Sequence, residues 1–340
     1  VTGDFQFDSG VLDLDTGTWT VAGNWDTSSL VVANLIRGSS TVTMTGTDKT
    51  ISTLNNQALN NINIEGTITQ EFQWYYAMGT MNITGTYTLK NEPYVNGALV
   101  LGDTGACYSF SGGAAERLRM AGTFNSAGGT LNCHVRFENS RTLPARTYGG
   151  NIELYSNNDA NHAVVLSAGT TTFSGNLALT SLFPGRTMTL DGTTNDPTVN
   201  VTGNISFDAS LFGSEIIQTG SNNWNVSGSI DLTGGTLTTE GTNTFILDSA
   251  AQQNITSDGE SFNNLTVKNT HVNGARPVGT LAVGGDLLVQ ADGASAVTLD
   301  NANNVVDNVT GGLSTTGAGA GAMNLKLGTG ATWQVGGSGN

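Results

Sequence analysis

The sequence predicts an all-β protein, a single-stranded parallel β-helix (β-solenoid) with turns of about 20 residues and a few loop inserts. The first observation is composition, with 46 Gly and only 5 Pro among 340 residues, of which 37% are hydrophobic. Disordered chains combine low hydrophobicity with high charge, and helical proteins need helix formers that are scarce here. We therefore expect one solenoid domain over residues 1–340, with Gly-rich terminal turns over 311–340.

The second observation is the alternation of apolar and polar residues, which is clearest in residues 222–270. Three short runs, each closed by Gly, Asn or Asp, have the period of two that predicts half-buried strands. A similar residue pattern recurs in residues 18–67, so the sequence predicts a repeat array. The expected inward positions are Trp224, Val226, Ile230, Leu232, Leu237, Phe245, Leu247, Ile255, Phe262, Leu265 and Val267.

The third observation is a recurring phrase, apolar–x–apolar–x–Gly. A unit of about 20 residues is too short for a propeller blade and has no helical half, but it fits three short strands joined by tight turns. At this length the chain would make roughly 17 turns. We expect Gly and Asn to supply corners with positive φ. The glycines that close the phrase are Gly23, Gly46, Gly66, Gly85, Gly122, Gly203, Gly228, Gly285 and Gly337.

Four stretches break the alternation and are expected to be loop inserts, where recognition often lies on rigid scaffolds. They are residues 70–79, 112–119, 140–146 and 181–186, and 112–119 is the stretch best suited to a helical turn. The first contains aromatic side chains that would stack on a sugar ring, plug the core or form a subunit contact. These are Phe72, Trp74, Tyr75 and Tyr76.

The low content of charged residues and the negative net charge limit the classes of partner that the chain could bind. Only 11% of the residues are charged and the formal net charge is −15. Nucleic-acid binding needs Lys and Arg to displace counterions, and an anionic membrane surface would also repel this chain. No apolar run approaches the ~20 residues that span a bilayer. We expect no nucleic acid partner and no membrane span.

Two cysteines, Cys107 and Cys133, leave two interpretations open. Either both are small core residues, or they form a disulfide between successive turns, as extracellular chains tolerate. No Cys or His spacing predicts a metal site, and His134, His162 and His271 are far apart in sequence. No nucleophile, phosphate-binding or metalloprotease motif is present, so we expect no catalytic residues, no enzyme activity and no cofactor.

The phrases W-x-V-x-G-N/S, TVTMTG and F-N-N-L-T-V resemble the β-solenoid repeats of filamentous-haemagglutinin-like and autotransporter-type surface proteins. The resemblance covers most of the chain as a style of repeat. It implies an adhesive or structural protein located outside the cell or at its surface, typically without catalysis. It assigns no binding residue.

These observations lead to a functional hypothesis: a secreted structural subunit that self-assembles end to end into an extracellular filament, sheath or layer, with itself as partner. Residues 1–14 alternate like a strand, and Phe5, Phe7, Val11 and Leu12 are expected to complete a neighbour's sheet. If the C-terminal tail is ordered, a neighbouring subunit is a natural candidate for holding it. The alternative is a glycan-binding or glycan-cleaving adhesin or phage-fibre module that recognises cell-surface glycan.

Overall fold

The computed structural model is an all-β solenoid of about 13 turns of roughly 23 residues, with almost no helix. It describes residues 1–72, 75–113, 115–208, 213–301, 306–317, 321–327 and 332–335. The chain divides into two compact units. Unit 1 comprises residues 1–141 and 148–152, and unit 2 comprises residues 142–147 and 153–340.

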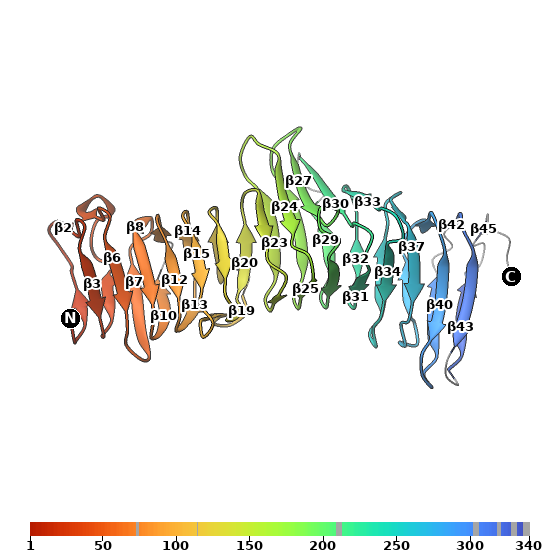
Figure 1. Cartoon of the computed structure of the whole chain (residues 1–340), viewed down its shortest axis with the longest axis horizontal. Coiled ribbons are helices and arrows are strands. Elements are labelled where there is room, and N and C mark those ends of the chain that lie inside the picture. The colour runs from red at the N-terminus through yellow and green to blue at the C-terminus, as the bar shows by residue number, and fades with distance from the viewer. Residues whose placement is uncertain are drawn as a thin grey trace. The chain divides into compact units, whose positions relative to one another are not determined.

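In unit 1 the strands form parallel columns, and each strand pairs with its equivalent one turn later (Figure 1). The first column is β1 (Phe5–Gln6), β4 (Trp25–Thr27), β7 (Lys49–Thr53), β10 (Thr67–Phe72), β13 (Thr86–Leu89), β16 (Ala106–Ser109) and β19 (Thr130–Asn132). The second is β8 (Gln57–Leu59), β11 (Tyr75–Ala77), β14 (Tyr94–Val95), β17 (Arg117–Met120) and β20 (His134–Phe137). The third is β3 (Thr18–Val21), β6 (Thr41–Met44), β9 (Asn61–Ile64), β12 (Met81–Ile83), β15 (Leu99–Leu101) and β18 (Phe124–Ser126). A two-stranded sheet of β2 (Leu12–Asp13) and β5 (Leu35–Ile36) adjoins a single 3-10 turn, η1 (Val32–Asn34).

Unit 2 repeats this design. One column is β26 (Leu177–Ser181), β29 (Ile205–Phe207), β32 (Ile230–Asp231), β35 (Gln253–Thr256), β38 (Ala275–Pro277), β41 (Val297–Asn301) and β44 (Met323–Leu327). A second is β25 (Thr170–Phe173), β28 (Thr198–Val201), β31 (Trp224–Val226), β34 (Thr244–Leu247), β37 (Asn264–Val267), β40 (Leu287–Ala291) and β43 (Leu313–Gly317). Shorter columns are β24 (His162–Leu166), β27 (Thr187–Asp191), β30 (Ser214–Gln218) and β33 (Thr236–Thr238), and β36 (Ser261–Phe262), β39 (Ala282–Val283), β42 (Val306–Val309) and β45 (Thr332–Val335). The division between the units falls among β21 (Arg141–Leu143), β22 (Thr147–Tyr148) and β23 (Ile152–Ser156).

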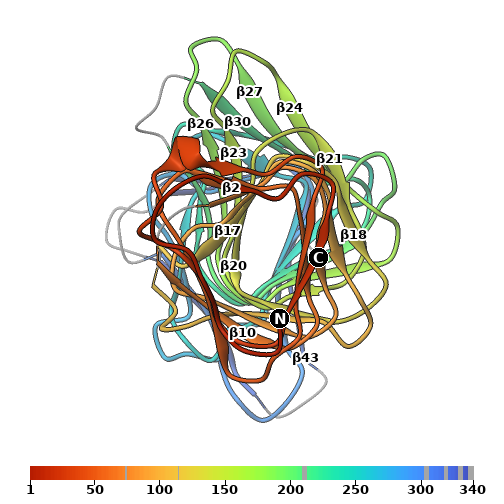
Figure 2. The ribbon, with the colours of Figure 1, turned by 90° about the vertical axis from the view of Figure 1, so that its left-hand side faces the viewer.

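The core of each unit consists of apolar side chains stacked on their equivalents one turn away. In unit 2, Trp224 pairs with Phe245, Phe245 with Leu265, and Leu265 with Leu287. All the inward positions expected in residues 222–270 are buried, which confirms the alternation. Figure 2 shows the red turns of unit 1 winding around a common axis.

The turns are longer than expected, so there are fewer than the 17 that a 20-residue repeat implies. Met81 pairs with Leu99, 18 residues further on, whereas Thr171 pairs with Val199, 28 residues further on. The added length of unit 2 lies partly in long strands such as β24 and β27, which Figure 1 shows in green. A period read from the first four repeats therefore underestimates the average turn.

Glycine and Asn56 supply corners with positive φ as expected, but the described glycines of the recurring phrase serve another purpose. Positive φ occurs at other glycines, such as Gly220 and Gly241, and at Asp15, Asp48, Asn56, Asp196 and Asp258, so those residues supply the left-handed corners. The described phrase glycines lack positive φ but touch the backbone of the preceding turn. A Cβ on Gly228 would overlap the carbonyl oxygen of Gly203, and one on Gly66 would overlap that of Gly46. Only Gly lets consecutive turns stack this closely.

We expect Gly228→Ala to lower the stability of unit 2 by about 1–3 kcal/mol, because the new methyl group overlaps backbone atoms that cannot rotate away. The matched control is Gly293→Ala, since nothing lies within 4 Å of the Cβ position there and its φ is not positive. Urea unfolding of both variants measures the difference. Equal stability of the two variants would show that the turns separate freely at Gly228.

A ladder of side-chain oxygens near these glycines accepts hydrogen bonds from backbone N–H groups of the next turn. In unit 1, Asp4 Oδ1 accepts from Asn24 N at 2.8 Å, and Asn24 Oδ1 accepts from Thr50 N at 2.9 Å. In unit 2, Asn264 Oδ1 accepts from Asp286 N at 2.9 Å. Each side chain therefore caps an N–H group one turn further along, which ties neighbouring turns together.

Two predicted inserts are largely ordinary turns of the solenoid. Residues 70–79 contain the end of β10 and all of β11. Residues 112–119 form no helix in their described part, because the Glu116 carboxylate accepts from Ser111 N at 2.6 Å and from Gly112 N at 3.0 Å and so closes a turn before β17. No described helix is long and apolar enough to cross a membrane.

Residues 1–14 form the chain's own first turn in this structure. Phe5 N donates to Asn24 O at 2.7 Å, and Leu14 N donates to Ile36 O at 2.8 Å. Phe5 stacks on Trp25 with ring centroids 4.5 Å apart, Leu12 is buried, Phe7 is half-buried and Val11 is exposed. At the other end, residues 311–317, 321–327 and 332–335 continue the array through β43, β44 and β45, and the expected ordered tail lies outside the described residues.

Candidate functional site

The predicted aromatic residues separate into two environments. Tyr75 lies in the core, where its hydroxyl shares a hydrogen bond of 2.6 Å with the hydroxyl of Tyr87. Burial raises the pKa of both phenols above the ordinary value. Tyr75 therefore fills the core, which is one of its expected roles. Phe72 belongs to β10, and Trp74 lies outside the described residues.

Tyr76 faces outward, unlike Tyr75, and is half-buried on the surface of β11. It pairs with Tyr94 on β14, and their rings meet edge to face with centroids 5.3 Å apart. The guanidinium of Arg119 lies over the Tyr94 ring, 5.1 Å from its centroid. Since Arg119 lies over this ring, Tyr94 does not offer an open stacking platform on that side.

The carboxylates beside these rings are already paired. Glu138 is 1% exposed and accepts from Arg119 Nε at 2.6 Å, and Glu92 is 5% exposed and pairs with Arg117. Burial raises the pKa of Tyr94, and the nearby Glu138 carboxylate adds to that rise. The cluster is consequently an ion-paired structural surface and does not provide the two accessible carboxyl groups that glycoside hydrolysis requires.

A groove of about 530 Å³ lies within unit 2, on the outer face of the column that contains β29, β32 and β35. The inward positions Ile205, Ile230 and Ile255 are buried and in register, which fixes the outward residues between them. Its lining is Asn176, Asn204, Ile205, Ser206, Ser229, Ile230, Asp231, Asn254, Thr256 and Val278.

Two polar columns line this groove. In the first, Asn204 N donates to Asn176 Oδ1 at 2.9 Å, and Ser229 N donates to Asn204 Oδ1 at 2.8 Å. Asn254 N continues the column by donating to Ser229 Oγ at 3.0 Å. The second column is formed by Ser206, Asp231 and Thr256, which are paired in register on consecutive turns.

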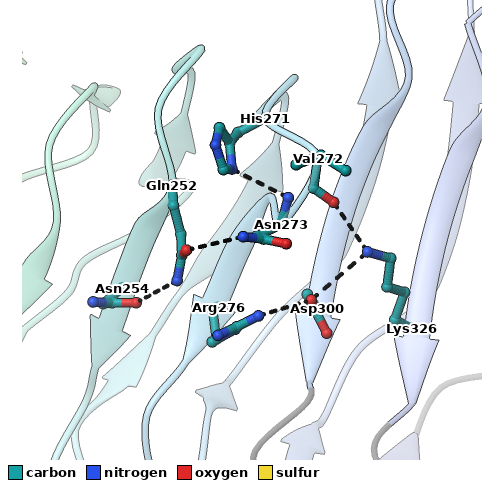
Figure 3. A network of polar contacts seen from close by, with 8 residues as sticks. All are labelled: Gln252, Asn254, His271, Val272, Asn273, Arg276, Asp300 and Lys326. Carbon is teal, nitrogen blue, oxygen red and sulfur yellow. Dashed lines mark hydrogen bonds and ion pairs between the residues drawn. The ribbon is translucent and has the colours of Figure 1, made fainter.

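A polar network borders the groove at Asn254 (Figure 3). Gln252 Nε2 donates to Asn254 Oδ1 at 3.2 Å, and Asn273 Nδ2 donates to Gln252 Oε1 at 3.3 Å. Farther along, Asp300 accepts from Arg276 Nη2 at 3.1 Å and lies 3.7 Å from Lys326 Nζ. The cations on this face of unit 2 therefore have a carboxylate partner, and no Lys or Arg lines the groove.

The cysteines are joined. Cys107 in β16 and Cys133 just after β19 form a disulfide with Cα atoms 5.5 Å apart, so the bond links successive turns of unit 1. Within the part of the chain that the structure describes, no group of three His, Cys, Asp or Glu residues has an arrangement suited to a metal ion.

Sequence reasoning did not find the groove. A signal for it exists, because Asn176 and Asn204 both follow a glycine at the same point of consecutive repeats. Single-sequence alternation shows that such residues face outward, but it does not show that adjacent turns leave a hollow between them. No protein-family model matches the chain, and no curated protein or solved structure matches it either.

Proposed function

We propose that the chain is a structural subunit of an extracellular filament, sheath or layer, in which copies stack end to end through the open edges of their sheets. The supporting observation is that each unit has strands that are paired on one side only among the described residues. In unit 1, β1 and β2 are edge strands, and in unit 2, β43, β44 and β45 are edge strands. Exposed strand edges carry unpaired backbone groups that accept another strand.

The parallel direction of strand pairing is also compatible with end-to-end stacking of copies. All the described strand pairs in both units are parallel, which suits a head-to-tail contact between an edge of unit 2 in one copy and an edge of unit 1 in another. Such a heterologous contact does not close and generates fibres. In this contact residues 1–14 remain paired with their own chain, and β1 offers its other edge to the next copy.

Other features support the extracellular setting. The Cys107–Cys133 disulfide is typical of oxidising compartments. The repeat phrases resemble those of filamentous-haemagglutinin-like and autotransporter-type surface proteins. A low charge content and a fully stacked core suit a scaffold more than a catalyst.

The test blocks one hydrogen-bonding edge. Phe5 N donates to Asn24 O, just before β4, at 2.7 Å, and Phe7 N donates to Asp26 O in β4 at 3.0 Å, so the N–H of Gln6 faces the other edge of β1. Proline at an edge position whose N–H faces outward removes no internal bond. We expect the purified chain to form filaments under negative-stain electron microscopy, Gln6→Pro to abolish or shorten them, and the control Gln6→Ala to retain them.

Two outcomes would overturn this proposal. If sedimentation and microscopy show that the wild-type chain stays monomeric at high concentration, the proposed end-to-end assembly is wrong. Filaments of equal length in wild type and Gln6→Pro would show that β1 is not the contact. Circular dichroism of the variants verifies that the solenoid has folded in each sample.

A further inference from the structure

We propose that the groove in unit 2 binds a neutral oligosaccharide in extended conformation. The inference is independent of end-to-end assembly, since the groove lies on a lateral sheet face and the assembly contact lies on strand edges. The groove volume of about 530 Å³ is within the range of ~300–1,000 Å³ that holds small ligands. It is large enough for a few sugar units.

The hydrogen-bonding groups are pre-oriented. Asn204 Oδ1 is held by Ser229 N, and Asn254 Oδ1 is held by Gln252 Nε2. Because the amide group is planar, anchoring the oxygen fixes the direction of the NH2 group. Among the described residues neither NH2 group has a hydrogen-bond partner, so both are available as donors.

The second column supplies the acceptors. Asp231 Oδ1 accepts from Thr233 N at 3.1 Å and from Thr233 Oγ1 at 2.6 Å, which leaves Oδ2 available. The hydroxyls of Ser206 and Thr256 flank it one turn away on each side and act as both donors and acceptors. Amide donors beside carboxylate and hydroxyl acceptors match sugar hydroxyls, each of which donates and accepts.

Charge and spacing select this ligand class. Because the lining carries one carboxylate and no Lys or Arg, it disfavours phosphate, sulfate and uronate groups. The polar groups repeat once per turn, at the ~4.8 Å spacing of neighbouring strands. This spacing is closer to the advance per sugar in an extended glycan than to the ~3.4 Å advance per residue in an extended peptide. Val278, 41% exposed, adds an apolar contact for the C–H face of a sugar ring.

The test uses isosteric substitutions that preserve the ladder. In Asn204→Asp and Asn254→Asp the side-chain oxygen still accepts its hydrogen bond, while the NH2 donor is replaced by a second oxygen. Asn24→Asp is the matched control, because Asn24 has the same ladder role in unit 1 and is not among the residues that line the groove. The probes are cellotriose, chitotriose and, as the charged comparison, a trisaccharide of galacturonic acid.

Saturation-transfer difference NMR is the measurement. We expect the wild type and Asn24→Asp to bind at least one neutral trisaccharide with a dissociation constant in the millimolar range. Asn204→Asp and Asn254→Asp should each weaken this binding at least tenfold. The proposal is overturned if neither neutral probe binds, if the groove variants bind as the wild type does, or if the galacturonic acid probe binds more tightly than the neutral ones.

Discussion

Replacing Phe262 by alanine is expected to lower the free energy of unfolding of unit 2 by about 3–5 kcal/mol. Phe262 is fully buried, and its ring meets Phe245 edge to face with centroids 5.0 Å apart. Phe245 in turn contacts Trp224 with centroids 5.7 Å apart. Removal of one ring therefore leaves a cavity beside an aromatic column that spans several turns, and the stacked backbone cannot collapse to fill it.

Hydrogen exchange followed by mass spectrometry measures this loss and locates it. In a repeat array each turn contacts only its neighbours, so strands near β36 should lose protection while unit 1 keeps it and serves as an internal control. Val272→Ala is the matched variant, because Val272 is 73% exposed. A change at Phe262 as small as the ~0.5 kcal/mol usual for surface sites would contradict its role in the core.

Much of the fold could be predicted because one signal, the period of two, determines which side chains face inward. The period of two places Trp224, Phe245 and Phe262 in the core, and all three are buried. The same rule fails where both faces of a strand are apolar. Tyr75 and Tyr76 are neighbours with similar side chains, and the sequence gives no reason why Tyr75 enters the core while Tyr76 faces outward.

What could not be predicted depends on contacts between turns. Glycine in a repeat suggests a left-handed corner, but at Gly228 the requirement comes from the carbonyl of Gly203, 25 residues earlier, which approaches too closely for any Cβ. The groove poses the same difficulty, since Asn204, Asp231 and Asn254 are brought together by strand register. Register depends on turn length, and turn length varies along this chain.

Loss of the disulfide is the second large expected effect. In the double variant Cys107→Ala/Cys133→Ala, unit 1 should lose roughly 3–4 kcal/mol of stability. The bond closes a loop with a sequence separation of 26, and opening it restores chain entropy to the unfolded state. Both cysteines are fully buried, so alanine at these positions also leaves a small void in a packed column.

The position of the bond makes the effect local and therefore testable within one molecule. Because Cys107 and Cys133 both belong to unit 1, urea unfolding monitored by hydrogen exchange should show β16 and β19 opening at lower denaturant, while unit 2 strands such as β31 and β34 keep the wild-type midpoint. Reductant should shift the wild type towards the variant and leave the variant unchanged. An equal shift of the urea midpoint in both units would contradict nearest-neighbour stacking. An unchanged midpoint in unit 1 would show that the stacked turns already hold this loop closed without the covalent bond.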